Sequence, residues 1–154
     1  MTRVPHPPAV ADRAVPLVLA VYGTLRRGCR NAGLLAGARH VADGHLRGAL
    51  HEVSAPLGRA YGYPLLVVPG THLVRVEAYE VGDPAALDAL DALEAFDPAD
   101  PAGSEYVRVL VPLFDETGHP TGLDVQTYAY AGAVEGVGAL VPGGDWVRHA
   151  GDLA

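Results

Sequence analysis

Short runs of apolar residues, separated by glycine and proline, make up the hydrophobic pattern of this chain. Runs of this length that are bounded by turn-forming residues predict strands. In chain order the predicted strands are 15–20, 41–53 (a bent strand pair broken at Gly44 and Gly48), 64–68 (stopped by Pro69 and Gly70), 73–81, 106–114 and 123–131. Residues 54–63 and 98–103 predict loops, and residues 115–122 predict the turn of a hairpin.

Two segments predict helices. Residues 85–96 are rich in helix formers, with Asp83 as the N-cap, Pro84 in the first turn and Asp97 followed by proline at the end. Residues 31–38 predict a short helix. Together with the strands, these helices favour an α+β domain with a strongly curled mixed or antiparallel sheet. Residues 1–13 predict an N-terminal arm, and residues 14–154 predict a single domain in which Trp146 is a packing residue.

One carboxylate of the longer predicted helix lies on its apolar side. Leu87, Leu90 and Leu93 share one arc, and Glu94 lies about 20° from Leu87 and about 40° from Leu90 on an ideal helix. Its acidic neighbours, Asp91 among them, are expected to face water. Burial raises the pKa of a carboxyl group, so Glu94 is a candidate general acid or base. Two structural alternatives stay open, because the helix can fray before Glu94 or Glu94 can pair with Arg108 or another cation.

The apolar run 15–20 ends in a loop that is a candidate ligand-binding site. Gly23 has no side chain to block a ligand from the backbone N–H groups, so this loop is a plausible cradle for a carboxylate. An ordinary turn is the alternative. Arg26, Arg27 and Arg30 form a basic cluster beside the loop, and for Arg26 and Arg27 solvation is favoured over substrate binding. For Asn31 a structural role is favoured, either as a cap of the short helix or as a brace of the loop.

Composition excludes several other functions. A formal charge of −7 argues against nucleic acid as the main partner, and no apolar stretch reaches the roughly 18 residues that a membrane helix needs. The single cysteine excludes an intrachain disulfide, and the seven histidines lack the spacing of a metal site. We therefore expect a soluble cytoplasmic protein without a metal or another cofactor, whose oligomeric state, monomer or homodimer, is open.

Several stretches occur in an order and spacing typical of one family. They are the loop Tyr22-Gly23-Thr24-Leu25 followed by Asn31, the helix Leu87 to Phe96, the strand that begins Tyr106-Val107-Arg108, and Tyr128-Ala129-Tyr130. Between residues 17 and 130 the chain resembles the gamma-glutamylcyclotransferase-like family, which includes gamma-glutamylamine cyclotransferases and a gamma-glutamyl-removing enzyme of butirosin biosynthesis. The family's Glu-Gly-Tyr sequence is Glu94-Ala95-Phe96 here. The resemblance implies a closed or nearly closed β-barrel flanked by short helices.

The resemblance also implies a site and a reaction. Glu94 is the implied catalytic acid/base, and Tyr22, Gly23, Thr24 and Leu25 form the implied substrate-binding loop. Tyr106, Tyr128 and Tyr130 are expected in the core or barrel wall, and Tyr106 and Tyr128 are the candidates for a phenol that contacts substrate. The implied substrate is a gamma-glutamyl amide whose alpha-amine attacks its own gamma-carbonyl, which releases 5-oxoproline and an unidentified amine. The alternatives are a non-catalytic relative that binds a small anionic metabolite or a partner in the same pocket, and a simple amidase.

Overall fold

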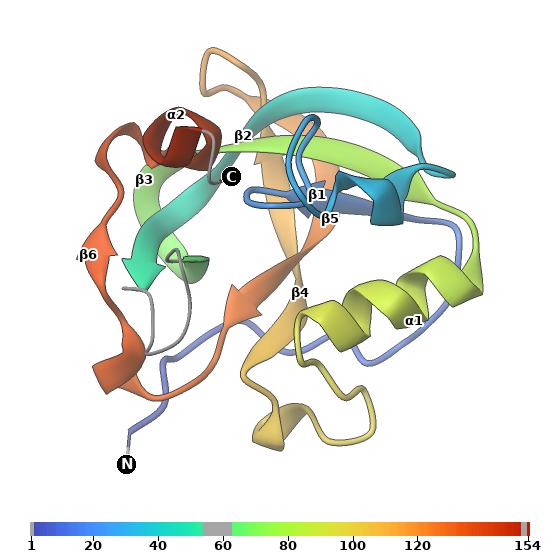
Figure 1. The fold of residues 1–154 in the computed structure, drawn as a ribbon, viewed down its shortest axis with the longest axis horizontal. Helices are drawn as coiled ribbons and strands as arrows, with labels where there is room; N and C mark the ends of the chain where they lie inside the picture. Colours follow the sequence, from blue (N-terminus) through green and yellow to red (C-terminus); the bar gives the residue numbers. More distant parts are fainter. Residues whose placement is uncertain (1, 54–62, 152–153) are drawn as a thin grey trace.

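The computed structural model describes residues 2–53, 63–151 and 154 (Figure 1). In this part of the chain the strands are β1 (Leu17–Val21), β2 (Arg39–Val53), β3 (Tyr63–Val81), β4 (Tyr106–Phe114), β5 (Pro120–Tyr130) and β6 (Ala139–Leu140). The α-helices are α1 (Pro84–Leu93) and α2 (Trp146–Ala150), and the 3-10 helices are η1 (Ala32–Leu35), η2 (Pro101–Gly103), η3 (Val134–Gly136) and η4 (Pro142–Gly144). The predicted loop 54–63 lies outside the described residues except for its last position.

The strands pair around a nearly closed ring, which confirms the predicted curled α+β sheet. The order is β3-β1-β5-β4-β2, and β2 pairs again with β3, while β6 adds to the outer edge of β2. All pairs are antiparallel except β1 with β5. The seam between β2 and β4 is narrow, with one Cα pair between His45 and Phe114.

Two predicted strand interruptions are wrong. β2 is one strand across Gly44 and Gly48, and β3 continues through Pro69 and Gly70. β2 and β3 pair on both sides of this region, and residues 68–71 of β3 form a bulge between the pairs Gly48–His72 and Ala49–Val67. At this bend a Cβ on Gly70 would lie 2.6 Å from the backbone carbon of Gly48. The glycines therefore permit a close strand crossing at a bulge and do not end either strand.

Signals within a few residues of the sequence predict most of the other elements correctly. β4 has the predicted bounds, and β5 begins three residues earlier than expected, which confirms the hairpin. The Asp83 carboxylate accepts a hydrogen bond from the Ala85 amide at 2.9 Å, so the start of α1 is also confirmed. The predicted helix 31–38 is a single 3-10 turn. Within the described ranges, no helix has the length and hydrophobicity to span a membrane.

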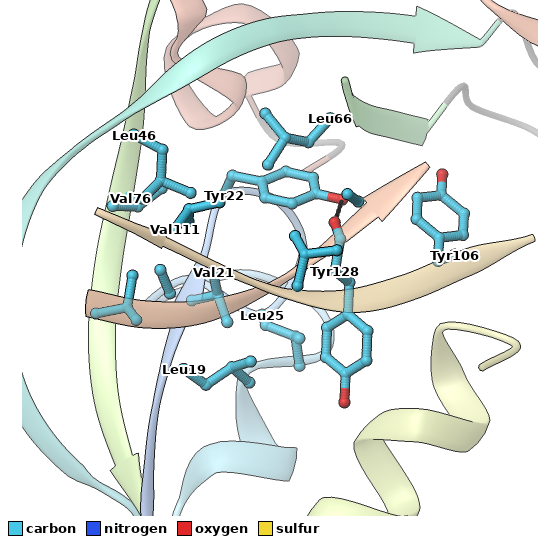
Figure 2. Close-up of a cluster of buried hydrophobic side chains, with 14 of the residues drawn as sticks. Leu19, Val21, Tyr22, Leu25, Leu46, Leu66, Val76, Tyr106, Val111 and Tyr128 are labelled. Atoms are coloured by element: carbon cyan, nitrogen blue, oxygen red, sulfur yellow. Dashed lines mark hydrogen bonds between the residues drawn. The ribbon is translucent and has the colours of Figure 1, made fainter. Parts of the chain in front are cut away.

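The N-terminal arm packs against the rest of the molecule. Arg3 forms a β-bridge with Ala133, Ala9 forms one with Val109, and Val4 is buried. The core lies inside the ring, where side chains from all long strands meet (Figure 2). The labelled aliphatic core side chains in this view are Leu19, Val21, Leu25, Leu46, Leu66, Val76 and Val111.

Candidate active site

A pocket of about 540 Å³ lies where the loop after β1, the end of α1 and the starts of β3 and β4 meet. It is lined by Ala20, Val21, Tyr22, Gly23, Thr24, Leu25, Arg30, Asn31, Tyr63, Pro64, Leu93, Glu94, Ala95, Glu105, Tyr106 and Tyr128. All seven residues that the sequence analysis assigned to a site are in this set. Their shared location is a finding, whereas their roles stay predictions.

The binding-loop candidate is braced by Asn31, as the structural interpretation predicted. The Asn31 side-chain amide donates to Thr24 Oγ1 at 2.9 Å, and the Asn31 backbone amide donates to the Thr24 carbonyl at 2.9 Å. Because Thr24 Oγ1 accepts this bond, its own hydroxyl proton is left for another acceptor. At Gly23 a Cβ would lie 2.6 Å from Pro64 Cγ, so this glycine is needed for packing between loop and β3 as well as for access.

A buried ionic network also holds the same loop in place. Glu77, which is 4% exposed, accepts hydrogen bonds from Arg26 Nε at 3.0 Å, from the Arg27 amide at 2.9 Å and from the Tyr79 hydroxyl at 2.7 Å. Burial alone raises the pKa of Glu77, but these donors outweigh it and hold that pKa below its usual range. Arg26 also donates to Asp145 Oδ1 at 2.8 Å. The expectation that Arg26 is solvated is therefore wrong, whereas the Arg27 side chain is exposed.

Glu94 is presented by a Schellman turn. α1 ends at Leu93, with Glu94 as its C-cap, so the predicted helix end at residue 96 is wrong. The Phe96 amide donates to the Asp91 carbonyl at 2.9 Å, and the Ala95 amide donates to the Ala92 carbonyl at 3.2 Å. These two bonds define the motif, in which the residue after the cap is left-handed. Here that residue is Ala95, with φ of 51°, at a position where glycine is usual.

The arc prediction is right for Glu94 and wrong for two of its neighbours. Glu94 is partly buried at the pocket wall, but Leu93 is 41% exposed and Asp91 is only 2% exposed. Asp91 is buried because Arg108 pairs with it, with Arg108 Nε donating to Asp91 Oδ1 at 2.9 Å. Arg108 was a possible partner of Glu94, but in the structure it pairs with Asp91.

The surroundings of Glu94 favour its protonated form. Burial raises the pKa of Glu94 to about 7, and the negative charge of Glu105 across the pocket acts in the same direction. Its position at the C-terminus of α1 adds the negative end of the helix dipole. A carboxyl group with a pKa near neutrality can both take up and release a proton, which suits acid/base chemistry.

Three of the four tyrosines that line the pocket donate hydrogen bonds to protein acceptors. Tyr22 donates to the Tyr128 carbonyl at 2.7 Å, as Figure 2 shows, and Tyr128 points toward α1, where it donates to Asp91 Oδ1 at 2.5 Å. Tyr106 donates to the Pro64 carbonyl at 3.2 Å. Burial, with the nearby charges of Glu94 and Asp91, raises the pKa of these phenols, so all three stay protonated. Each phenol oxygen therefore keeps a lone pair that can accept a further hydrogen bond.

Sequence reasoning missed Glu105, and it missed that Arg108 pairs with Asp91. Glu105 lines the pocket, and no pattern singled it out because it is an exposed acid just before a strand. Arg108 carried a usable signal, since an arginine within the apolar strand Tyr106–Phe114 needs a buried partner. No group of three or more histidine, cysteine, aspartate or glutamate side chains suited to a metal ion is found among the described residues.

Residues 19–148 match the family described as "Gamma-glutamyl cyclotransferase, AIG2-like". The chain belongs to this family. The match includes every residue of the pocket and the predicted catalytic glutamate. The comparison with curated proteins finds no match.

Solved structures share the fold of this AIG2-like chain. An AIG2-like protein from Mus musculus is 25% identical, with a TM-score of 0.58 over 80% of this chain and 83% of that chain. The protein ytfP from Escherichia coli is 28% identical, with a TM-score of 0.55 over 85% of this chain and 96% of that chain. The uropathogenic E. coli protein c4763 is 20% identical and shares the fold, with a TM-score of 0.60 over 92% of this chain and all of that chain.

Proposed function

We propose that this protein is a gamma-glutamyl cyclotransferase that converts a gamma-glutamyl amide into 5-oxoproline and a free amine. The observation that supports the proposal most is that one pocket contains both Glu94, with its raised pKa, and the family's loop Tyr22 to Leu25. Membership of the gamma-glutamyl cyclotransferase family supports the same reaction class. No protein nucleophile is required, because the substrate supplies its own.

The reaction needs a proton to move between two nitrogens of the substrate. The alpha-ammonium group first loses a proton, and its nitrogen then forms a bond to the gamma-carbonyl carbon and loses a second proton. The amide C–N bond breaks as the leaving nitrogen gains one proton, and the other proton goes to the released amine or to solvent. In the proposed mechanism Glu94 takes up a proton from the attacking nitrogen and delivers it to the leaving nitrogen. An alpha-amine has a pKa of about 8 and an ordinary glutamate one of about 4.3, so this transfer normally costs roughly 5 kcal/mol. With the pKa of Glu94 at about 7, the cost falls to roughly 1.4 kcal/mol.

The loop has a complementary role in this proposal. The Thr24 hydroxyl, the backbone N–H groups around Gly23 and the Arg30 guanidinium line one part of the pocket and suit a carboxylate or a developing oxyanion. The phenol oxygens and Glu94 accept hydrogen bonds and suit the amino group. Holding the glutamyl chain folded between these groups supplies on the order of 7–11 kcal/mol of the barrier reduction through orientation.

A screen of gamma-glutamyl amides by mass spectrometry tests the proposal. We expect at least one substrate to release 5-oxoproline, and Glu94→Gln to lower kcat/KM by about 10²–10⁴-fold. Glu116→Gln, a surface substitution on an exposed side chain outside the pocket lining, is the matched control and retains wild-type activity. Full activity in Glu94→Gln refutes the role of Glu94. Tight binding of a small anion without turnover of any amide supports a non-catalytic relative, and release of glutamate supports an amidase.

A further inference from the structure

The Asp91 and Arg108 side chains form the most completely enclosed ion pair in the described part of the molecule. Arg108 is 0% exposed and Asp91 2% exposed. Arg108 Nε donates to Asp91 Oδ1 at 2.9 Å, and Arg108 Nη2 lies 3.4 Å from Asp91 Oδ2. The pair joins α1 to β4, and neither residue lines the pocket. The proposed reaction therefore assigns it no direct role.

Every nitrogen of the Arg108 guanidinium has a partner. Besides the two bonds to Asp91, Arg108 Nη1 donates to Gln126 Oε1 at 2.7 Å and to the Asp12 carbonyl at 3.1 Å. The guanidinium also lies over the ring of Phe96, with Cζ 5.3 Å from the ring centre. Contacts from β5, from the N-terminal arm and from the turn after α1 thus hold Arg108 in one place.

Asp91 connects this fixed cation to the pocket by two routes. Its carboxylate accepts a hydrogen bond from the hydroxyl of Tyr128, which lines the pocket. Its backbone carbonyl accepts a hydrogen bond from the Phe96 amide, which closes the turn around Glu94. The same residue therefore sets the orientation of the Tyr128 phenol and the position of the Glu94 backbone. The edge-to-face contact between Phe96 and Tyr128, at 6.5 Å between ring centres, joins the two routes.

We infer that Asp91 and Arg108 are a positioning pair, which holds the end of α1 so that the Glu94 carboxyl faces the reacting nitrogen of the substrate. This inference rests on the proposed function for its catalytic meaning. A purely structural role is the competing explanation. The two explanations predict different results for a variant in which apolar residues of similar volume replace the pair. Such a replacement of a buried ion pair often leaves the stability of a protein unchanged or increases it.

The test is the double variant Asp91→Leu/Arg108→Met, compared with the exposed pair variant Arg39→Gln/Glu80→Gln. We expect the first to unfold at or above the wild-type denaturant midpoint, while kcat falls on the order of 100-fold and KM changes little. The pKa of Glu94, measured by carbon-13 NMR of its carboxyl group, is expected to fall toward the ordinary value as water enters. The control variant keeps the wild-type kcat and the wild-type pKa of Glu94.

Both variants leave intact four groups that line the pocket with Glu94, so a shift in its pKa reports its position. They are Glu105, Arg30, Tyr22 and Tyr106. A stable double variant with wild-type kcat and an unchanged pKa of Glu94 overturns the inference. If the double variant does not fold, Tyr128→Phe and Asp91→Asn decide. The first removes the hydrogen bond from Tyr128 to Asp91, the second removes the negative charge that pairs with Arg108, and both nearly keep the side-chain volume. Unchanged kcat and an unchanged pKa of Glu94 in both of these variants overturn the inference equally.

The two proposals fail in different ways. If no amide is turned over by the wild-type protein, the proposed function fails, yet the NMR titration of Glu94 still measures whether the pair holds that carboxyl. If the wild-type protein is active and the double variant equally so, only the positioning inference fails.

Discussion

Replacing Ala95 by glycine is expected to stabilise the protein, because Ala95 occupies a backbone conformation that suits glycine. Its φ is 51°, and it follows the C-cap of α1 in the Schellman turn that carries Glu94. A left-handed conformation costs an L-residue about 1–2 kcal/mol. Glycine removes this cost but makes the unfolded chain more flexible, which returns about 0.4–1 kcal/mol. The Ala95 side chain is exposed, so its methyl group adds little burial.

The net expectation is a gain of about 0.5–1 kcal/mol in the free energy of unfolding, or a rise of about 1–4 °C in Tm. Trp146, the single tryptophan, is 1% exposed and provides a fluorescence signal for denaturant unfolding. The midpoint should rise while the m-value stays constant. The matched control is Ala89→Gly, at an exposed position inside α1, which is expected to cost about 1 kcal/mol. If Ala95→Gly destabilises the protein as much as this control does, the account of the turn is wrong.

Three further predictions concern the charges of the pocket and the strand crossing. At pH 8 Glu94→Gln is expected to stabilise the fold by up to about 3 kcal/mol, because the pKa of Glu94 is raised from 4.5 to about 7. The wild-type protein loses this stability as the pH rises through 7, whereas the variant does not. Equilibrium unfolding at pH 4 should therefore show little difference between the two proteins. The kcat/KM of the wild-type protein is expected to fall below about pH 7 as Glu94 gains a proton, and Glu105→Gln should move this limb to lower pH because it removes a neighbouring negative charge; a limb that stays in place argues against their coupling. Gly70→Ala is expected to cost about 1–3 kcal/mol by denaturant unfolding, because its Cβ would meet the Gly48 backbone at 2.6 Å, whereas Gly37→Ala, with open space around it, should be neutral.

The parts of the fold that the sequence predicts well depend on neighbouring residues. The β4–β5 hairpin and the start of α1 at Asp83 each follow from signals within a few positions. The continuity of β3 through Pro69 and Gly70 depends on pairing with β2 on both sides of the bulge at residues 68–71, which no local pattern reveals. A glycine that ends a strand and a glycine that permits a crossing look alike in the sequence, and only the partner strand distinguishes them.

The sequence predicted residues that line one pocket, but it predicted less well how that pocket is built. Glu94 was recognised from its place on the apolar arc, although a turn, and not a continued helix, presents it. That turn has alanine where glycine would have marked it. Asp91 was expected in water because its partner Arg108 lies 17 positions away, and Arg26 was expected in water because Glu77 lies 51 positions away. Buried charges with distant partners cannot be recognised from a single helix face or a single loop.

The contact between Arg26 and Asp145 spans 119 positions of the chain and has a consequence for the order of events during synthesis. On a translating ribosome the segment around Arg26 leaves the exit tunnel long before Asp145 is joined to the chain. Nascent chains stalled ahead of that residue must hold the guanidinium without this anion. The ionic network that supports the loop is thus completed only once Asp145 has been made, 119 positions after Arg26.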